Sequence, residues 1–162
     1  MDNDPYYPYR KSPRAHFHNY AHGVYFITFC TEDKIHYLGE IINGEIFYSD
    51  LGHYTVQCLE CISTRYRNIT VEHYVVMPNH VHALIEIVES DTAPSHAVRS
   101  PLSIVVGQLK QAVTMYARRN EINFRWQRGY HDHIIRNERE HGMIAEYIID
   151  NVARWADDIF SK

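Results

Sequence analysis

Two histidines stand two positions apart inside an apolar stretch. His80 and His82 belong to the run MPNHVHALI, residues 77–85. Side chains on a β-strand alternate between faces and advance about 3.3 Å per residue, so both imidazoles project from one face. Two imidazoles at this spacing can bind one divalent ion. In a chain with 12 histidines a surface or hydrogen-bonded pair is the simpler interpretation, unless a third ligand joins them.

A tyrosine and an asparagine near the C-terminal end supply further polar groups. Tyr147 and Asn151 are spaced i and i+4, which places them on one face of a helix. The Tyr147 hydroxyl and the Asn151 amide oxygen can therefore contact the same ligand. Tyr147 could act as a nucleophile. Tyr116, which also falls on an expected helix with arginines nearby, is the other candidate. An interface role for Tyr147 and a helix-end role for Asn151 are the structural alternatives.

Phosphodiester cleavage is one reaction that groups of these types could carry out. Mg²⁺ or Mn²⁺ held by two imidazoles and an amide would polarise a nonbridging phosphate oxygen. A tyrosine would attack the phosphorus. Since the free phenol has a pKa of about 10, metal proximity or a nearby base must favour loss of its proton.

Strands and helices must position these residues. The apolar patterning and turn residues predict strands over 24–31, 37–42, 45–48, 70–76, 80–88 and 131–136, and helices over 51–66, 101–120 and 137–157. Asn43-Gly44 favours a two-residue hairpin turn. We expect helix N-caps at Asp50, at Ser100 or Pro101, and at Asn137.

Without the hairpin, the order of elements is β, α, β, β, α, β, α. The first six match an α+β, ferredoxin- or RRM-like split βαβ fold: a four-stranded antiparallel sheet with both helices on one face. The other face is left free for ligands, and the last helix is the catalytic one.

Length and composition predict one soluble domain. With 162 residues, of which 45% are hydrophobic and 22% charged, we expect an N-terminal arm over 1–22 and a single catalytic domain over 23–162. There is no signal-peptide pattern and no apolar run long enough to span a membrane. Three cysteines are too few for a disulfide framework. These features predict a cytoplasmic protein without a membrane partner.

Charge is distributed unevenly along the chain. The net charge of −4 argues against nucleic-acid binding through charge alone. Segment 110–139, however, holds seven basic and three acidic residues. Its candidate DNA contacts are Arg118, Arg119, Arg125, Trp126, Arg128, Tyr130 and Arg136. The arginines would contact phosphates and the aromatic rings would stack on bases, whereas a solvated face and core packing are the alternatives. His133 would orient a metal ligand through a hydrogen bond.

Three motifs in fixed order resemble a known family. The strand MPNHVHALI, the stretch WQRGYHDHIIR at 126–136 and the terminal EYIIDN at 146–151 resemble the HUH single-tyrosine transposases. Within that superfamily they resemble the REP-associated tyrosine transposases, over about residues 20–157. The resemblance implies that His80, His82 and Asn151 hold the metal. It also implies that Tyr147 forms a 5′-phosphotyrosine and releases a 3′-hydroxyl. Val152 replaces the family's usual proline, which lets the last helix continue.

We therefore expect a metal-dependent endonuclease and strand transferase that acts on single-stranded or hairpin DNA. A catalytically idle nucleic-acid-binding module is one alternative, because the split βαβ sheet is a common platform for bases. A metal-dependent hydrolase that uses the two histidines and water is another. Both a monomer and a homodimer are compatible with the sequence.

Overall fold

The computed structural model describes residues 22–89 and 99–157. The expected N-terminal arm, except His22, lies outside the described residues, as does the end of the chain after residue 157. Within the described ranges, no helix combines the length and apolar character that crossing a membrane requires.

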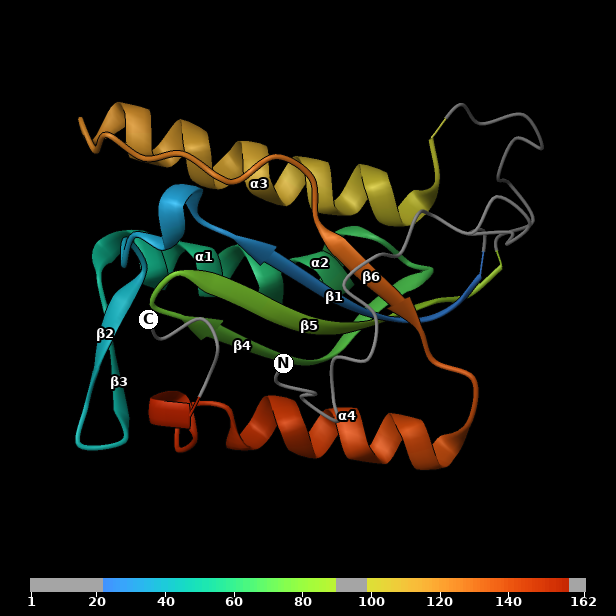
Figure 1. Cartoon of the computed structure of the whole chain (residues 1–162). Coiled ribbons are helices and arrows are strands. Elements are labelled where there is room, and N and C mark those ends of the chain that lie inside the picture. The colour runs from blue at the N-terminus through green and yellow to red at the C-terminus, as the bar shows by residue number, and fades with distance from the viewer. Residues whose placement is uncertain (1–21, 90–98, 158–162) are drawn as a thin grey trace.

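A four-stranded antiparallel sheet forms the centre of the molecule, as predicted. Its strands are β1 (Gly23–Cys30), β4 (Ile69–Met77), β5 (His80–Ile87) and β6 (His131–Ile134), in the order β4-β5-β1-β6 (Figure 1). The chain between β4 and β5 is the short turn at Pro78-Asn79, so these strands form a tight hairpin. The α+β class is confirmed.

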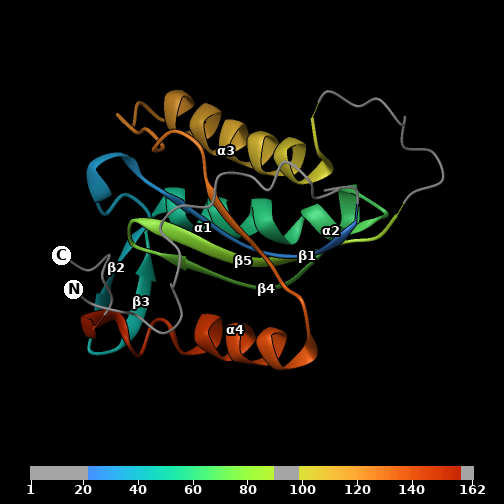
Figure 2. The same ribbon diagram turned by 45° about the vertical axis from the view of Figure 1, so that its right-hand side comes forward.

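Helices cover both faces of this sheet. Helices α1 (Asp50–Glu60), α2 (Ile62–Arg65) and α3 (Pro101–Arg119) lie on one face, and α4 (Glu138–Asp150) lies on the other (Figures 1 and 2). The first six elements leave this second face open, and α4, the expected catalytic helix, covers it. Apolar side chains on that face, including Phe26 and Leu84, pack with Ile148 of α4, and their burial explains why the helix covers it.

The alternation of β1 produces two separate cores. Tyr25, Ile27 and Phe29 point into the larger cluster beneath α1 and α3. Phe26, between them in sequence, points into the smaller cluster beneath α4. This period of two explains why almost the whole strand is buried.

A second, two-stranded sheet is formed by β2 (Gly39–Ile42) and β3 (Glu45–Tyr48). The turn between them has φ values of 52° at Asn43 and 79° at Gly44. Both values are positive, as the hairpin turn predicted from Asn-Gly requires.

The first helix differs from the prediction at both ends. Its N-cap is Ser49 rather than Asp50, because the Ser49 side chain accepts a hydrogen bond from the Gly52 amide at 3.1 Å. The predicted helix over 51–66 is divided into α1 and α2 at Cys61, where ψ is −15°, well away from the α-helical value of about −42°.

The last helix begins as predicted and ends early. Asn137 caps α4 by accepting from the Glu140 amide at 2.9 Å. The helix ends at Asp150, not near Asp157. After it, the Asn151 amide donates to Ile148 and the Trp155 amide to Val152, so the chain tightens into 3₁₀-type turns ending in η2 (Trp155–Asp157). Having Val152 instead of proline is therefore not sufficient to continue the helix.

Candidate active site

His80 and His82 lie side by side on the sheet face that α4 covers. His80 pairs with Cys30 of β1 and His82 with Thr28, and the two ring centroids are 4.5 Å apart. Both residues are 0% exposed. The Phe26 ring stacks on His82 at 5.2 Å. The shared face agrees with the strand alternation, whereas the burial follows from α4 and could not be read from the motif.

Tyr147 approaches this pair from α4. Its hydroxyl lies 3.4 Å from Nε2 of His82, and its ring packs edge-on against Phe26 at 6.1 Å. The rival Tyr116 lies on the opposite side of the sheet, where it stacks on Tyr54 at 4.2 Å. Of the two candidate tyrosines, Tyr147 is therefore the one beside the histidines.

Asn151 follows one turn after Tyr147 and is 2% exposed. Its Oδ1 is buried and has no hydrogen-bond partner among the described residues. Such an oxygen costs folding free energy unless something binds it, and a cation is a suitable partner. The described residues contain no group of three or more His, Cys, Asp or Glu that could hold a metal. Two neutral imidazoles and a buried amide oxygen are chemically suited to a divalent cation.

Burial keeps both imidazoles neutral. It lowers the pKa of His82 to about 3. It also lowers the pKa of His80 well below the ordinary value, with smaller electrostatic contributions from neighbouring residues such as Lys34. Neutral imidazole is the form that binds metal ions, so the site is in that form at neutral pH.

Each imidazole is held by a hydrogen bond at Nδ1. Nδ1 of His82 lies 2.7 Å from Oγ1 of Thr28, and Nδ1 of His80 lies 2.8 Å from Oδ1 of Asn79. Such bonds orient ligand histidines in metal sites. Sequence reasoning missed both residues. Strand pairing alone brings Thr28 to His82, and the turn at Pro78-Asn79 bends Asn79 back toward its neighbour.

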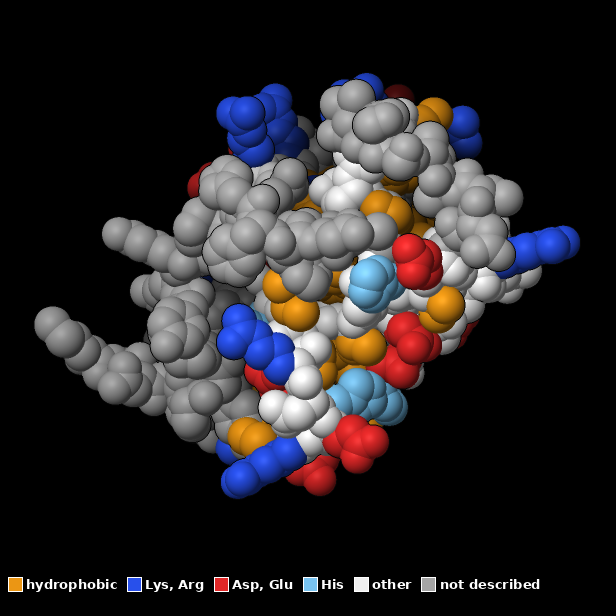
Figure 3. All heavy atoms as spheres, turned by 90° about the vertical axis from the view of Figure 1, so that its right-hand side faces the viewer, with side chains coloured by type: hydrophobic (Ala, Val, Ile, Leu, Met, Phe, Trp, Pro, Cys, Tyr) orange, Lys and Arg blue, Asp and Glu red, His pale blue; other side chains and the backbone are white. Residues whose placement is uncertain are grey.

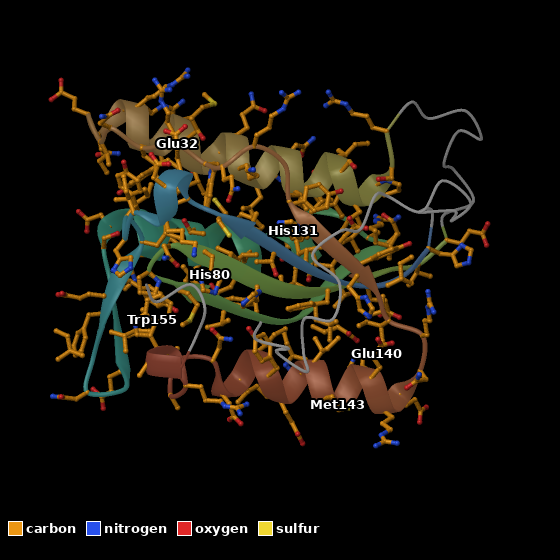
Figure 4. All side chains as sticks on the ribbon, in the orientation of Figure 1. Glu32, His80, His131, Glu140, Met143 and Trp155 are labelled. Carbon is orange, nitrogen blue, oxygen red and sulfur yellow. The ribbon has the colours of Figure 1, made fainter. Side chains whose placement is uncertain are left out.

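Trp155, which follows α4, packs against His80 and is itself flanked by His36. The Trp155 indole stacks on His80 with centroids 6.1 Å apart, and His36 packs edge-on against the same indole at 5.6 Å. Figure 4 shows His80 and Trp155 at the end of the molecule that carries the β2–β3 hairpin. The tightened turn after α4 thus closes one side of the site.

His133 lies elsewhere. Its Nε2 bonds the Glu140 carboxylate, and Nε2 of the neighbouring His141 bonds Glu72 of β4 at 2.7 Å. Because β6 and β4 are opposite edges of the sheet, these pairs fasten the start of α4 to both edges. Figure 3, which views this end of the molecule, shows histidine and acidic side chains side by side. His133 therefore holds the helix that carries Tyr147.

The residues predicted to contact DNA lie in different parts of the structure. Arg118, Arg125 and Arg128 line an open groove between α3 and segment 122–128, with a volume of about 820 Å³. Arg119 lies toward α1, where its charge acts on Tyr54. Arg136 precedes α4, and its amide donates to Glu140 at 2.8 Å. The groove lies on the α3 side of the sheet, opposite α4 (Figure 2).

The two predicted stacking rings are packed into this region. The Trp126 indole donates to the Lys110 carbonyl at 3.2 Å and meets Phe29 and Phe124 edge-on at 5.1 and 4.8 Å. The Tyr130 hydroxyl lies 3.0 Å from Ser103. Both rings are half-buried. Trp126 therefore forms part of the groove wall, whereas Tyr130 packs at the start of α3.

Comparison with known proteins places the chain in a family. Residues 25–151 match the family described as "Transposase IS200 like". An uncharacterized protein of Haemophilus influenzae strain Rd is 36% identical over 165 residues, covering 93% of this chain and 92% of that protein. A REP-associated tyrosine transposase solved with a REP hairpin shares the fold, with a TM-score of 0.54 and 20% identity. That match covers 80% of this chain and 66% of the other. Since the family match spans most of the domain around His80, His82 and Tyr147, the protein belongs to the IS200-like transposases and is a DNA-processing enzyme of the transposase type.

Proposed function

We propose that this enzyme cleaves and rejoins single-stranded or hairpin DNA through a covalent bond to Tyr147. The observation that carries the proposal is the 3.4 Å approach of the Tyr147 hydroxyl to Nε2 of His82, a buried imidazole that is neutral at neutral pH. A nucleophile beside a metal-binding pair is the arrangement that phosphodiester cleavage by a side chain requires.

The ligands would be His80, His82 and Asn151. They fit Mg²⁺ or Mn²⁺, which polarises a nonbridging phosphate oxygen when bound. The Tyr147 oxygen attacks the phosphorus and gives its proton to water. The tyrosine–phosphorus bond forms, the bond to the 3′-oxygen breaks, and this oxygen leaves as a hydroxyl after taking up a proton. Attack by a 3′-hydroxyl on the phosphotyrosine reverses the step and joins strands.

The DNA would also contact the groove lined by Arg118, Arg125 and Arg128. Phosphate contacts of this kind position a nucleic acid. The structural neighbour was solved with a REP hairpin, which supports a hairpin or single strand as the substrate here. Since the groove and Tyr147 lie on opposite sides of the sheet, a DNA molecule that touches both must pass around a sheet edge. We assign catalysis to one domain over 23–162, acting in the cytoplasm.

A denaturing gel tests the covalent step. Labelled hairpin DNA with a single-stranded flank, incubated with the protein and Mn²⁺, should give a protein–DNA adduct that survives denaturation. Tyr147→Phe keeps the ring and loses the hydroxyl, so it should bind DNA and form no adduct. Tyr116→Phe is the matched control and should form the adduct normally.

The same gel separates the alternatives. An idle binding module would leave the DNA intact with the wild-type protein. A hydrolase that uses the two histidines and water would cut the DNA without an adduct, and Tyr147→Phe would retain the cutting. Either result would contradict the assignment of Tyr147.

A further inference from the structure

The turn that precedes His80 is held by a loop from β1. The Thr31 amide donates to the Asn79 carbonyl at 2.8 Å, and the Leu38 amide donates to the Pro78 carbonyl at 3.0 Å. Between these contacts, Asp33 and Lys34 have φ values of 54° and 55°. Two consecutive residues other than glycine in the left-handed region are rare and cost free energy. The rest of the fold must therefore hold them there.

This left-handed pair presents a carbonyl to Asn79. The Lys34 carbonyl accepts a hydrogen bond from Nδ2 of Asn79 at 3.1 Å. A carbonyl oxygen cannot donate, so the amide of Asn79 must turn its NH₂ group toward Lys34. The contact thus fixes which side of the amide is nitrogen, an assignment that otherwise depends on the surrounding network.

The orientation of Asn79 determines the proton on His80. With NH₂ directed at Lys34, Oδ1 faces Nδ1 of His80 at 2.8 Å. An amide oxygen only accepts, so Nδ1 must carry the proton in this hydrogen bond. A neutral imidazole carries one ring proton. Nε2 of His80 therefore carries the lone pair. A ring nitrogen with a free lone pair is what metal binding requires.

The hydrogen bonds of His82 to Thr28 and Tyr147 are of a different kind. Its Nδ1 contacts a hydroxyl, that of Thr28, and its Nε2 lies near another hydroxyl, that of Tyr147. A hydroxyl can donate or accept, so these contacts are compatible with either tautomer. The chain of one-way hydrogen bonds from Lys34 through Asn79 is specific to His80.

We propose that Asn79 is a positioning residue that sets the tautomer of His80, with the Lys34 carbonyl as its anchor, so that Nε2 is ready to bind a cation. The inference rests on the proposed role of His80 as a metal ligand. It gives the left-handed conformation at Asp33 and Lys34 a function, because that conformation presents the anchoring carbonyl. Hydrogen-bond partners of ligand histidines change metal affinity about 10- to 100-fold when they are replaced.

Long-range ¹H–¹⁵N NMR of the metal-free full chain at pH 8 reports the tautomer of each histidine. We expect His80, assigned by the loss of its signals in His80→Gln, to show the Nδ1–H pattern. Asn79→Leu removes the acceptor and should populate the Nε2–H form, and its Kd for Mn²⁺ should rise about 10- to 100-fold. Asn79→Asp loses the NH₂ group that donates to the Lys34 carbonyl but keeps an oxygen that accepts from Nδ1, so it should retain the Nδ1–H pattern.

Thr31→Val is the matched control for a merely structural effect. It removes the hydroxyl that donates to the Asn79 carbonyl at 3.1 Å and leaves the Asn79 side chain in place. We expect the same turn to loosen and the tautomer to stay Nδ1–H. An Nε2–H pattern in the wild type, or an Nδ1–H pattern that persists in Asn79→Leu, would overturn the proposal. A wild type that shows Nδ1–H yet binds no Mn²⁺ would instead contradict the proposed function.

Discussion

The buried amide of Asn151 carries a cost to stability that the proposed metal site would offset. Its Oδ1 is buried and has no hydrogen-bond partner among the described residues. An unsatisfied buried polar group costs about 1–3 kcal/mol. Replacing the whole amide by an apolar group of similar shape removes that cost together with the proposed ligand.

Asn151→Leu should therefore raise or preserve the free energy of unfolding, by up to about 1 kcal/mol, while Mn²⁺ binding is lost. Urea unfolding and a titration of the metal-free protein with Mn²⁺ measure the two effects. The same change at Asn68, whose amide donates to the Val88 carbonyl at 3.4 Å, is the control and should give no gain in stability. A loss of more than about 2 kcal/mol in Asn151→Leu, or unchanged Mn²⁺ affinity, would show that Asn151 has a packing role instead.

At the scale of elements, α4 depends on contacts at its first turns. Glu140 bonds the His133 ring and the Arg136 amide. Burial raises the pKa of the Glu140 carboxyl, but these hydrogen bonds outweigh burial, and its pKa falls below the ordinary value of 4.5. A carboxyl whose pKa is lower in the folded state stabilises the protein above its unfolded pKa and loses this effect as the pH falls below it.

Glu140→Gln should lower the melting temperature at pH 6–7, and the difference from the wild type should shrink as the pH falls below about 4.5. For a partly exposed pair we expect a loss of about 0.5 kcal/mol. Thermal unfolding between pH 3 and pH 7 gives this comparison. Glu138→Gln removes a charge from the same turn and, within the described residues, breaks no ion pair, so its difference should be smaller. Curves that run parallel at every pH would contradict the assigned role of Glu140.

At the scale of the whole molecule, a chain with a negative net charge needs a locally basic surface to bind DNA, because DNA is a polyanion. The net charge is −4, yet Lys110 and three arginines line the groove beside α3. Arg119 is next to Arg118 in sequence and lies toward α1 instead, where Arg65 and Arg119 both act on Tyr54. The two neighbours therefore have different expected roles.

Replacing Arg118 and Arg125 together by Gln should weaken binding of single-stranded DNA and lower the slope of log K against log salt concentration by about 1.4, since each lost phosphate contact contributes about 0.7. Fluorescence anisotropy at several salt concentrations measures this slope. The Arg65 and Arg119 double variant changes the net charge equally and should leave the slope almost unchanged. Equal slopes in the two variants would mean that DNA binding depends on total charge and not on the groove.

Local sequence patterns are sufficient to predict most strands and helices, the histidine pair on β5, and the pairing of Tyr147 with Asn151 on one helix face. Strand alternation places His80 and His82 on one face, Asn43-Gly44 forms the expected hairpin turn, and Asn137 caps α4. These features depend on contacts between residues close in the chain, so the local pattern is sufficient to predict them.

How the histidine pair meets the helix that carries Tyr147 depends on contacts between segments that are distant in sequence. Pairing of β1 with β5 brings Thr28 to His82, packing of α4 on Phe26 and Leu84 buries the histidines under Tyr147, and tight turns end α4 at Asp150. Each of these involves segments distant in sequence or the burial of a shared apolar surface. Such contacts form only when the whole chain has folded, because their free energy comes from surface that no single element can bury alone.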